Sequence, residues 1–250
     1  MKPEELLGLP IPVIYLLLLA VESRVAVRPF EAVRRWRGAG ALFFVMVLVV
    51  GSAAPLLLPL VWFKSHPIFD LSGLGLLGIP VGLLATSFCG YWFHRAEHRF
   101  GWLWRASHQL HHSALRVDMP GAFYTHPLEV LLKVLIATTV SVYLLRLTPM
   151  AASAVGRIGA MLSMFQHWNI RTPHWLGYII PRPESHILHH ERNIHARNYG
   201  DLPVWDMLFG TYVNPRETWN GEVGYGTYAS ARVRDMLLMR DVNKQAVTDE

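Results

Sequence analysis

The sequence is poor in cysteine and in charged residues. Cys89 is the only cysteine among 250 residues, which excludes an intrachain disulfide, a zinc ribbon and a cysteine-bound iron–sulfur cluster. Charged residues make up 16% of the chain, against about 25% in an ordinary soluble domain. Hydrophobic residues make up 52% and the mean hydropathy is +0.26, which argues against a disordered chain and against a nucleic-acid-binding tail protein.

The signatures of several other protein classes are missing as well. No H-E-x-x-H occurs, because the first histidine motif reads HRAEH, so a zincin-type metalloprotease is excluded. No G-x-S-x-G elbow supports acyl transfer. The sequence contains neither C-x-x-C-H nor the His-Pro-Gly-Gly element of a fused cytochrome b5 module. Electrons for a redox reaction are therefore expected to come from a separate protein.

Five apolar runs are candidates for membrane spans, since about 20 apolar residues cross a bilayer. Residues 41–62 and 71–93 carry no charge and predict two transmembrane helices. Residues 128–147 and 150–166 predict a helical pair that either spans the membrane or re-enters it. The run 8–23 predicts an uncleaved anchor rather than a signal peptide, because acidic residues precede it and no small-residue cleavage site follows.

Arginines are concentrated in three loops that alternate with these runs. Counting the crossings places all three loops on one side of the membrane, and the positive-inside tendency assigns that side to the cytoplasm. Topology alone explains the arginines, with a specific anionic ligand as the alternative. The chain is thus expected to be a multi-pass protein of a bacterial inner membrane or the endoplasmic reticulum. The arginines are Arg24, Arg28, Arg34, Arg35, Arg37, Arg95, Arg99, Arg105, Arg116, Arg171, Arg182, Arg192 and Arg197.

These patterns predict an all-α fold, an integral membrane helical bundle of four to five spans with a histidine-rich cytosolic helical cap. Residues 1–213 are expected to form a single membrane domain. Residues 214–250 are polar and are expected to form a C-terminal tail.

Histidine is the residue in excess. Twelve of the thirteen histidines fall between His94 and His195, and most are spaced three or four residues apart, which places them on one face of a helix. Neutral imidazole suits iron, zinc, copper and nickel. Eight to ten imidazoles exceed one coordination sphere and fit two neighbouring ions. A carboxylate-bridged centre is not supported, because no nearby glutamate completes a Glu-x-x-His pattern.

Five segments together resemble the fatty acid hydroxylase/sterol desaturase superfamily of integral membrane oxidases with a histidine-bound dimetal centre. They are HRAEH (94–98), HQLHH (108–112), THPLE (125–129), FQHWNI (165–170) and HILHHERNIHARNYGDLPVWDMLFGTY (186–212). The resemblance covers about residues 90–213. It makes residues 1–213 a membrane oxidase domain, with histidine boxes at 94–112 and 186–190. The metal ligands it implies are His94, His98, His108, His111, His112, His126, His167, His186, His189 and His190.

The resemblance also implies the chemistry. Two iron ions would support O2-dependent hydroxylation or desaturation of a lipid C–H bond at the cytoplasmic face, with a fatty acyl, sterol or related lipid entering from the bilayer. The expected partner is a ferredoxin or cytochrome b5-like electron donor, and no nucleic acid. Asn198 and Asp206 would orient ligand imidazoles through hydrogen bonds, or would hold a turn and a helix cap. His174 and His195 have no counterpart in the family pattern.

Two other classes of function remain open. A zinc-dependent membrane hydrolase or isomerase could use the same histidines. A metal transport or storage protein is the second alternative, although no histidine-lined path crosses the spans.

Overall fold

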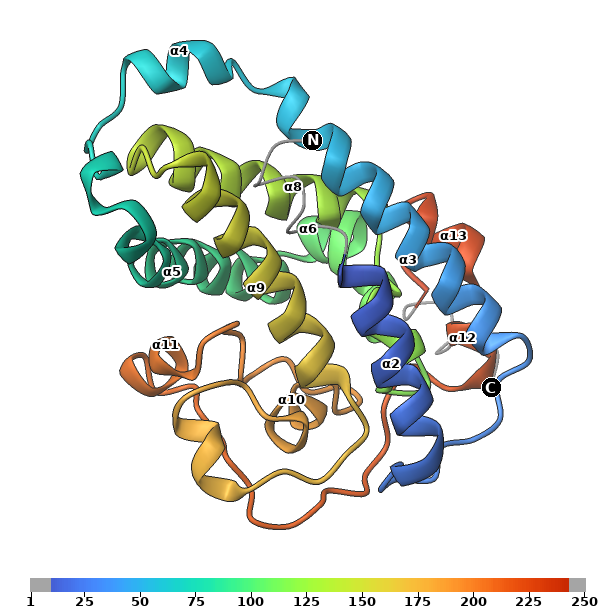
Figure 1. Ribbon diagram of the computed structural model, residues 1–250. Helices are drawn as coiled ribbons and strands as arrows, with labels where there is room; N and C mark the ends of the chain where they lie inside the picture. The colour runs from blue at the N-terminus through green and yellow to red at the C-terminus, as the bar shows by residue number, and fades with distance from the viewer. Residues whose placement is uncertain (1–9, 243–250) are drawn as a thin grey trace.

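The computed structural model describes residues 10–242, and its regular elements in that range are all helical. Among these residues, one isolated antiparallel bridge joins Glu191 and Val223. The predicted all-α class is therefore confirmed. The longer helices are α2 (Pro10–Val25), α3 (Trp36–Ala53), α5 (Gly78–Arg99), α8 (Pro127–Thr138) and α9 (Pro149–His167), and the six-residue α4 (Leu60–Ser65) lies between α3 and α5 in the chain (Figure 1). The shorter elements are η1 (Ala54–Leu57), η2 (Ser72–Leu77), α6 (Gly101–Leu103), η3 (Trp104–His108), α7 (Gln109–His112), η4 (Met119–Gly121), η5 (Thr139–Leu144), η6 (His174–Tyr178), α10 (Pro183–His189), α11 (Pro203–Leu208), α12 (Thr227–Ser230) and α13 (Val233–Leu237).

Three helical segments are long and apolar enough to cross a membrane. They overlap the predicted runs 41–62, 71–93 and 128–147, and the second continues past its run into the first histidine motif. The segments are Trp36–Leu57, Ser72–Arg99 and Pro127–Leu144.

Two of the five predicted spans lack this support. The run 8–23 corresponds to α2, which has 16 residues, and its first two residues lie outside the described range. The run 150–166 corresponds to α9, which carries Arg157 near its middle. Neither helix meets the length and composition expected of a span, so these two crossings stay predictions.

The run 41–62 is not one helix. α3 begins five residues earlier, at Trp36, and the helical segment ends at Leu57. Leu58 is extended, with φ −97° and ψ 147°, because a residue that precedes a proline is disfavoured in the helical region. After Pro59 the chain re-forms as α4, so the predicted boundary is corrected to Leu57.

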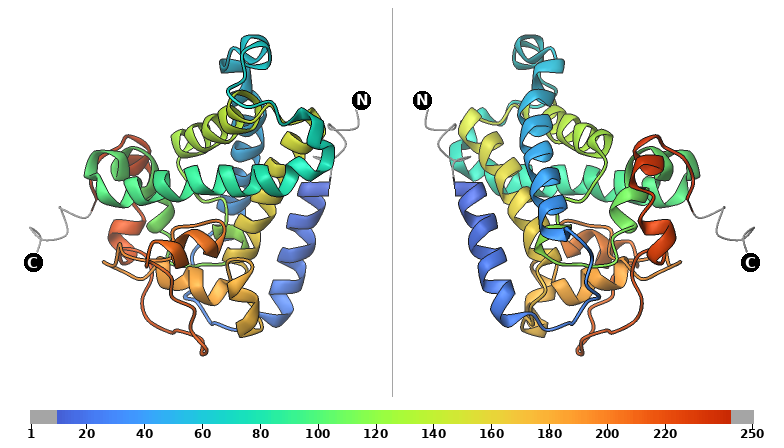
Figure 2. Two further views of the ribbon diagram at one scale, coloured as in Figure 1. Left: turned by 90° about the vertical axis from the view of Figure 1, so that its left-hand side faces the viewer. Right: turned by 90° about the vertical axis from the view of Figure 1, so that its right-hand side faces the viewer.

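Aromatic stacking and a close approach at a glycine bring the longer helices together. Tyr15 of α2 stacks on Phe44 of α3 with ring centroids 4.2 Å apart. α5 packs against α9 and runs across the direction of α3 (Figure 2). A Cβ atom on Gly82 of α5 would lie 2.6 Å from Leu147 and 2.7 Å from Val155. The missing side chain therefore allows α5 to approach the start of α9 closely.

The segment after residue 213 covers a histidine-bearing helix. The side-chain amide of Gln109 in α7 donates to the carbonyl oxygen of Arg240 (2.8 Å), and its oxygen accepts from the Val242 amide (3.1 Å). Met236 of α13 is completely buried in the same region. Sequence patterning predicts 214–250 as a polar tail, whereas its described part, 214–242, packs on α7.

Candidate metal centre

Four parts of the chain deliver histidines to one region. They are the end of α5, the η3–α7 segment, the end of α9, and α10 with the residue after it. Nine of the ten predicted ligands meet there and form two groups. Within each group, the ligand atoms all lie within 4.8 Å of one another. The first group is His94, His98, His108, His112 and His189; the second is His111, His167, His186 and His190.

The Nε2 atoms of the first group point at each other. His94 Nε2 lies 2.8 Å from His108 Nε2 and 3.3 Å from His98 Nε2. His112 Nε2 lies 3.1 Å from His189 Nε2. Four of the five imidazoles are buried, and His98 is half-buried.

The second group repeats this convergence with four buried imidazoles. His167 Nε2 lies 3.1 Å from His111 Nε2 and 3.0 Å from His186 Nε2. His190 Nε2 lies 3.1 Å from His186 Nε2. Nitrogen alone supplies the donors in both groups.

Each H-x-x-H-H motif contributes to both groups. His108 and His112 enter the first group, whereas His111 enters the second. In the other motif, His189 belongs to the first group, whereas His186 and His190 belong to the second. Successive helical residues are turned by about 100°, so adjacent histidines diverge and the two motifs lie between the two groups.

Backbone carbonyls fix the tautomers of several imidazoles. The Nδ1 atoms of His94, His167 and His189 face the carbonyl oxygens of Tyr199 (2.7 Å), Ser163 (2.7 Å) and Arg197 (2.8 Å). A carbonyl oxygen accepts hydrogen bonds and donates none, so Nδ1 carries the proton and Nε2 keeps a lone pair. The hydrogen-bonded Nδ1 atoms thus orient Nε2 toward the interior of each group.

Burial keeps these imidazoles neutral. Loss of solvation lowers the pKa values of His111, His112, His186, His189 and His190 well below 6.5, and neighbouring imidazoles lower them further. The Nδ1 atoms of His111 and His167 both face carbonyl oxygens, so their Nε2 atoms, 3.1 Å apart, each offer a lone pair and cannot hydrogen-bond to each other. A cation between them removes this repulsion, so the donor set fits metal ions, for which neutral imidazole is the required form.

A carboxylate group lies behind the first group. Glu129 Oε1 lies 3.0 Å from His108 Nδ1 and 2.5 Å from Lys133 Nζ. Glu97 is completely buried and accepts a 2.7 Å hydrogen bond from Ser107. Neither glutamate belongs to a Glu-x-x-His pattern, so the sequence does not predict a carboxylate-bridged centre here. The (i, i+4) spacing of Glu129 and Lys133 is the sequence signal for a charge pair on one face of the helix.

His126 lies outside both groups. It is the N-cap residue of α8: its Nδ1 accepts a hydrogen bond from the Leu128 amide (3.1 Å), and its Nε2 lies 3.2 Å from the carbonyl oxygen of Leu237. With both ring nitrogens engaged, His126 is positioned to stabilise the start of α8. Among the predicted ligands it is the one that the structure separates from the others.

Two histidines without a family counterpart have different surroundings. His195 is exposed, and its Nδ1 lies 3.0 Å from Nδ1 of His98 in the first group. Sequence reasoning missed this contact because it depends on the loop after α10. His174 instead lies 3.2 Å from the carbonyl oxygen of Asn214, away from both groups.

Asn198 and Asp206 form hydrogen bonds with backbone groups near the grouped histidines. Asp206 accepts hydrogen bonds from the amides of Tyr199 (2.8 Å) and Gly200 (2.7 Å), next to the carbonyl that holds His94. Asn198 donates to the carbonyl oxygen of Ser185 (2.7 Å). Asp206 thus holds the residue whose carbonyl faces His94, and Asn198 holds the residue that directly precedes His186.

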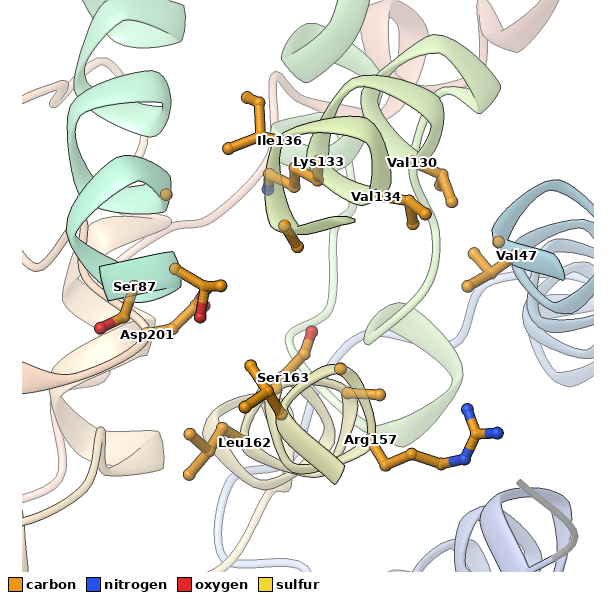
Figure 3. Close-up of a pocket in the computed structure, with 18 of the residues that line it drawn as sticks. Val47, Ser87, Val130, Lys133, Val134, Ile136, Arg157, Leu162, Ser163 and Asp201 are labelled. Carbon is orange, nitrogen blue, oxygen red and sulfur yellow. The ribbon is translucent and has the colours of Figure 1, made fainter. Parts of the chain in front are cut away.

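An apolar cavity of about 940 Å³ adjoins the histidines. Its walls come mainly from α3, α5, α8 and α9. Val47 of α3 faces Val134 of α8, and Ser163 of α9 points toward α8 (Figure 3). Five of the nine grouped histidines line the cavity: His94, His108, His111, His167 and His186. A long apolar molecule can therefore reach both groups from one side.

Comparisons with known proteins agree with this geometry. The chain matches the family model "Fatty acid hydroxylase" over residues 79–211. It is 30% identical over 151 residues to the ornithine lipid hydroxylase OlsE of Rhizobium tropici, covering 58% of this chain and 45% of that protein. It is 31% identical over 152 residues to human alkylglycerol monooxygenase, covering 57% and 31%. Sphinganine C4-monooxygenase 1 of Arabidopsis thaliana is 25% identical over 127 residues, covering 49% of each chain.

The matched regions have clear limits. Each covers less than half of the relative's own length. No solved structure matches the chain. The family model, however, spans more than half of this sequence and includes every histidine of the two groups. The protein belongs to the fatty acid hydroxylase family.

Proposed function

We propose that the protein is a membrane monooxygenase that inserts one oxygen atom of O2 into a lipid C–H bond at a di-iron centre. One observation carries the proposal: two buried groups of nitrogen donors adjoin one apolar cavity. Three relatives named as hydroxylases or monooxygenases of an ornithine lipid, alkylglycerol and sphinganine support a lipid substrate and hydroxylation. Desaturation is the alternative outcome at the same site.

Each histidine group would hold one ion. The first group would use His94, His98, His108, His112 and His189, and the second His111, His167, His186 and His190. When bound, iron would supply the activation of O2 that an unactivated C–H bond requires. The nitrogen-rich donor set suits iron, and it suits zinc equally well, so metal identity belongs to the test.

The chain's own residues orient the substrate and exclude water. The apolar walls would bind an acyl or sterol chain and hold one carbon against the histidines that line the cavity. Phe123 and Ala122 of the wall belong to a buried apolar cluster that also includes Met164. This packing would keep water out of the part of the cavity that these two residues line.

Electrons would come from a separate protein. Residues 73–78 have the spacing G-x-G-x-x-G, but no strand precedes them in the described chain, so they lack the context of a dinucleotide site. The arginine-rich loops support a multi-pass topology with the histidines at the cytoplasmic face. A ferredoxin or cytochrome b5-like carrier is the expected donor.

The test combines metal analysis with isotope labelling. The full chain is purified anaerobically and assayed for metal, beside a His111→Ala/His112→Ala variant that removes one donor from each group. Cells that express either form are then supplied with ¹⁸O2, and their lipids are analysed by mass spectrometry. About two irons per chain and a labelled hydroxylated lipid, both lost in the variant, are expected.

Each other result has a defined meaning. Loss of two hydrogens without label would identify desaturation. Two zincs in fresh anaerobic protein, together with an O2-independent product, would identify a hydrolase or isomerase. Absence of stoichiometric metal would overturn the proposal.

A further inference from the structure

The first histidine group comes close to the protein surface at one contact. His195 is exposed, and its Nδ1 lies 3.0 Å from Nδ1 of His98. The ring of His195 also packs edge-on against Trp104, with centroids 4.5 Å apart. Trp104 is itself 5.1 Å from the rings of both His98 and His112. A continuous imidazole–indole contact thus joins solvent to two members of the first group.

This contact lies apart from the substrate cavity. His94 and His108 of the first group line the cavity, whereas His98, His112 and His195 do not. The second group has no comparable exposure, because all four of its histidines are buried. A molecule that binds over His195 therefore approaches the centre without competing with a lipid in the cavity.

Five arginines lie within three residues of His98, Trp104 or His195 along the chain. They are Arg95 and Arg99 on either side of His98, Arg105 next to Trp104, and Arg192 and Arg197 in the loop of His195. Three acids pair with members of this set: Glu191 with Arg197, Glu222 with Arg192, and Asp241 with Arg105. The other two arginines, Arg95 and Arg99, have no acidic partner among the described residues, so the charge of this set is positive. Of these two, Arg99 is exposed.

We propose that His195 and Trp104, with the arginines around them, form the docking surface and electron entry for an acidic one-electron carrier protein. The proposal rests on the monooxygenase function and adds the place where the reductant binds. Positive charge around a redox contact steers an acidic partner and orients it. An anionic membrane surface would also favour arginines, but it would not require an imidazole–indole contact with the metal-binding group.

The electron balance requires two encounters for each turnover. One C–H bond, one O2, two electrons and two protons give one C–O–H group and one water. Each reduced carrier gives up one electron and leaves oxidised. Because the carrier must bind twice, reversible electrostatic docking suits the reaction better than a permanent complex.

Charge reversal at Arg99 tests the docking surface. The full chain in detergent is assayed with reduced plant-type ferredoxin, an acidic one-electron carrier, and separately with dithionite, which needs no docking surface. Arg99→Glu should raise the KM for ferredoxin about tenfold and weaken its salt dependence. The ratio of ferredoxin-driven to dithionite-driven product should fall accordingly. Lys64→Glu makes the same charge change at an exposed position on α4, which follows the C-terminal end of α3 and lies far from α10 (Figure 1). This control variant should leave the ratio unchanged.

Replacement of His195 separates electron entry from metal binding. His195→Phe keeps a ring against Trp104 but removes the contact to His98 through nitrogen. It should lower kcat with saturating ferredoxin about tenfold at an unchanged ferredoxin KM and full metal content. Loss of metal would show that His195 is a ligand and would overturn its assigned role.

The remaining outcomes distinguish the two proposals. Wild-type protein that turns over with dithionite but not with ferredoxin would overturn the acidic-carrier assignment alone. An equal loss with both reductants in Arg99→Glu would point to a lipid contact or a structural role and would also overturn it. Wild-type protein that forms no product with either reductant would count against the monooxygenase function itself.

Discussion

The carboxylate of Glu129 lies 3.0 Å from Nδ1 of His108, on the opposite side of the ring from the converging Nε2 atoms. Glu129 also contacts Lys133, which lines the cavity. Other imidazoles of the first group, such as His94 and His189, rest on neutral carbonyl oxygens. A carboxylate makes the imidazole a stronger electron donor than a carbonyl does. His108 is therefore set apart electronically within its group.

Replacement of Glu129 should weaken the first metal position. Glu129→Gln keeps the shape but removes the negative charge that supports His108. Loss of such an outer partner typically costs about 10- to 100-fold in metal affinity or activity, so metal titration should show weaker binding of one ion of the two. Glu217→Gln, at an exposed position, is the matched control. Unchanged metal affinity in Glu129→Gln would show that the contact is incidental.

His126 and His167 should respond differently to alanine. His167→Ala removes an Nε2 donor from the second group and should lose one bound ion. His126→Ala removes the side chain that caps α8, and loss of a cap typically costs about 1 kcal/mol. Its metal content should stay complete while its melting temperature falls. Metal analysis and thermal unfolding in detergent measure both effects, and loss of metal in His126→Ala would show that His126 is a ligand.

Local spacing predicts that these histidines lie close together in the structure, but it does not predict contacts between distant parts of the chain. The i, i+3 and i+4 spacings place His108, His111 and His112 close together because helix geometry is fixed by sequence separation alone. The H-P-L-E motif predicts a ligand at His126, whereas in the structure Glu129 is the residue of this motif that lies beside the first group. That difference depends on how α8 packs against η3, which periodicity does not encode. The contact between His98 and His195 depends in the same way on the loop after α10.

Removal of metal should make stability depend on pH. Burial lowers the pKa of His111, His112, His186, His189 and His190. Below pH 6.5 the unfolded chain therefore binds more protons than the folded chain, and the free energy of unfolding falls as the pH falls. Each imidazole contributes at most about 1.4 kcal/mol per pH unit.

Thermal unfolding of chelator-treated protein checks this prediction. The melting temperature should decline from pH 7 to pH 5. The His111→Ala/His112→Ala variant has two fewer buried imidazoles and should decline less steeply. Equal slopes for the two proteins would show that these histidines are solvated and protonated in the metal-free folded state.

The cavity should set the length of the substrate chain. Gly156 of α9 lines the cavity, and a Cβ atom there would meet nothing within 4 Å. It lies about 16 Å along the helix from His167, at 1.5 Å per residue, so Gly156→Leu should block the cavity far from the metal groups. Products with long chains should then decrease relative to short ones, while the turnover of short substrates is retained. Met161→Phe adds bulk on an exposed face of the same helix and should leave the product profile unchanged. Lipid mass spectrometry of the three proteins decides the matter, because a cavity that does not hold the chain would give three identical profiles.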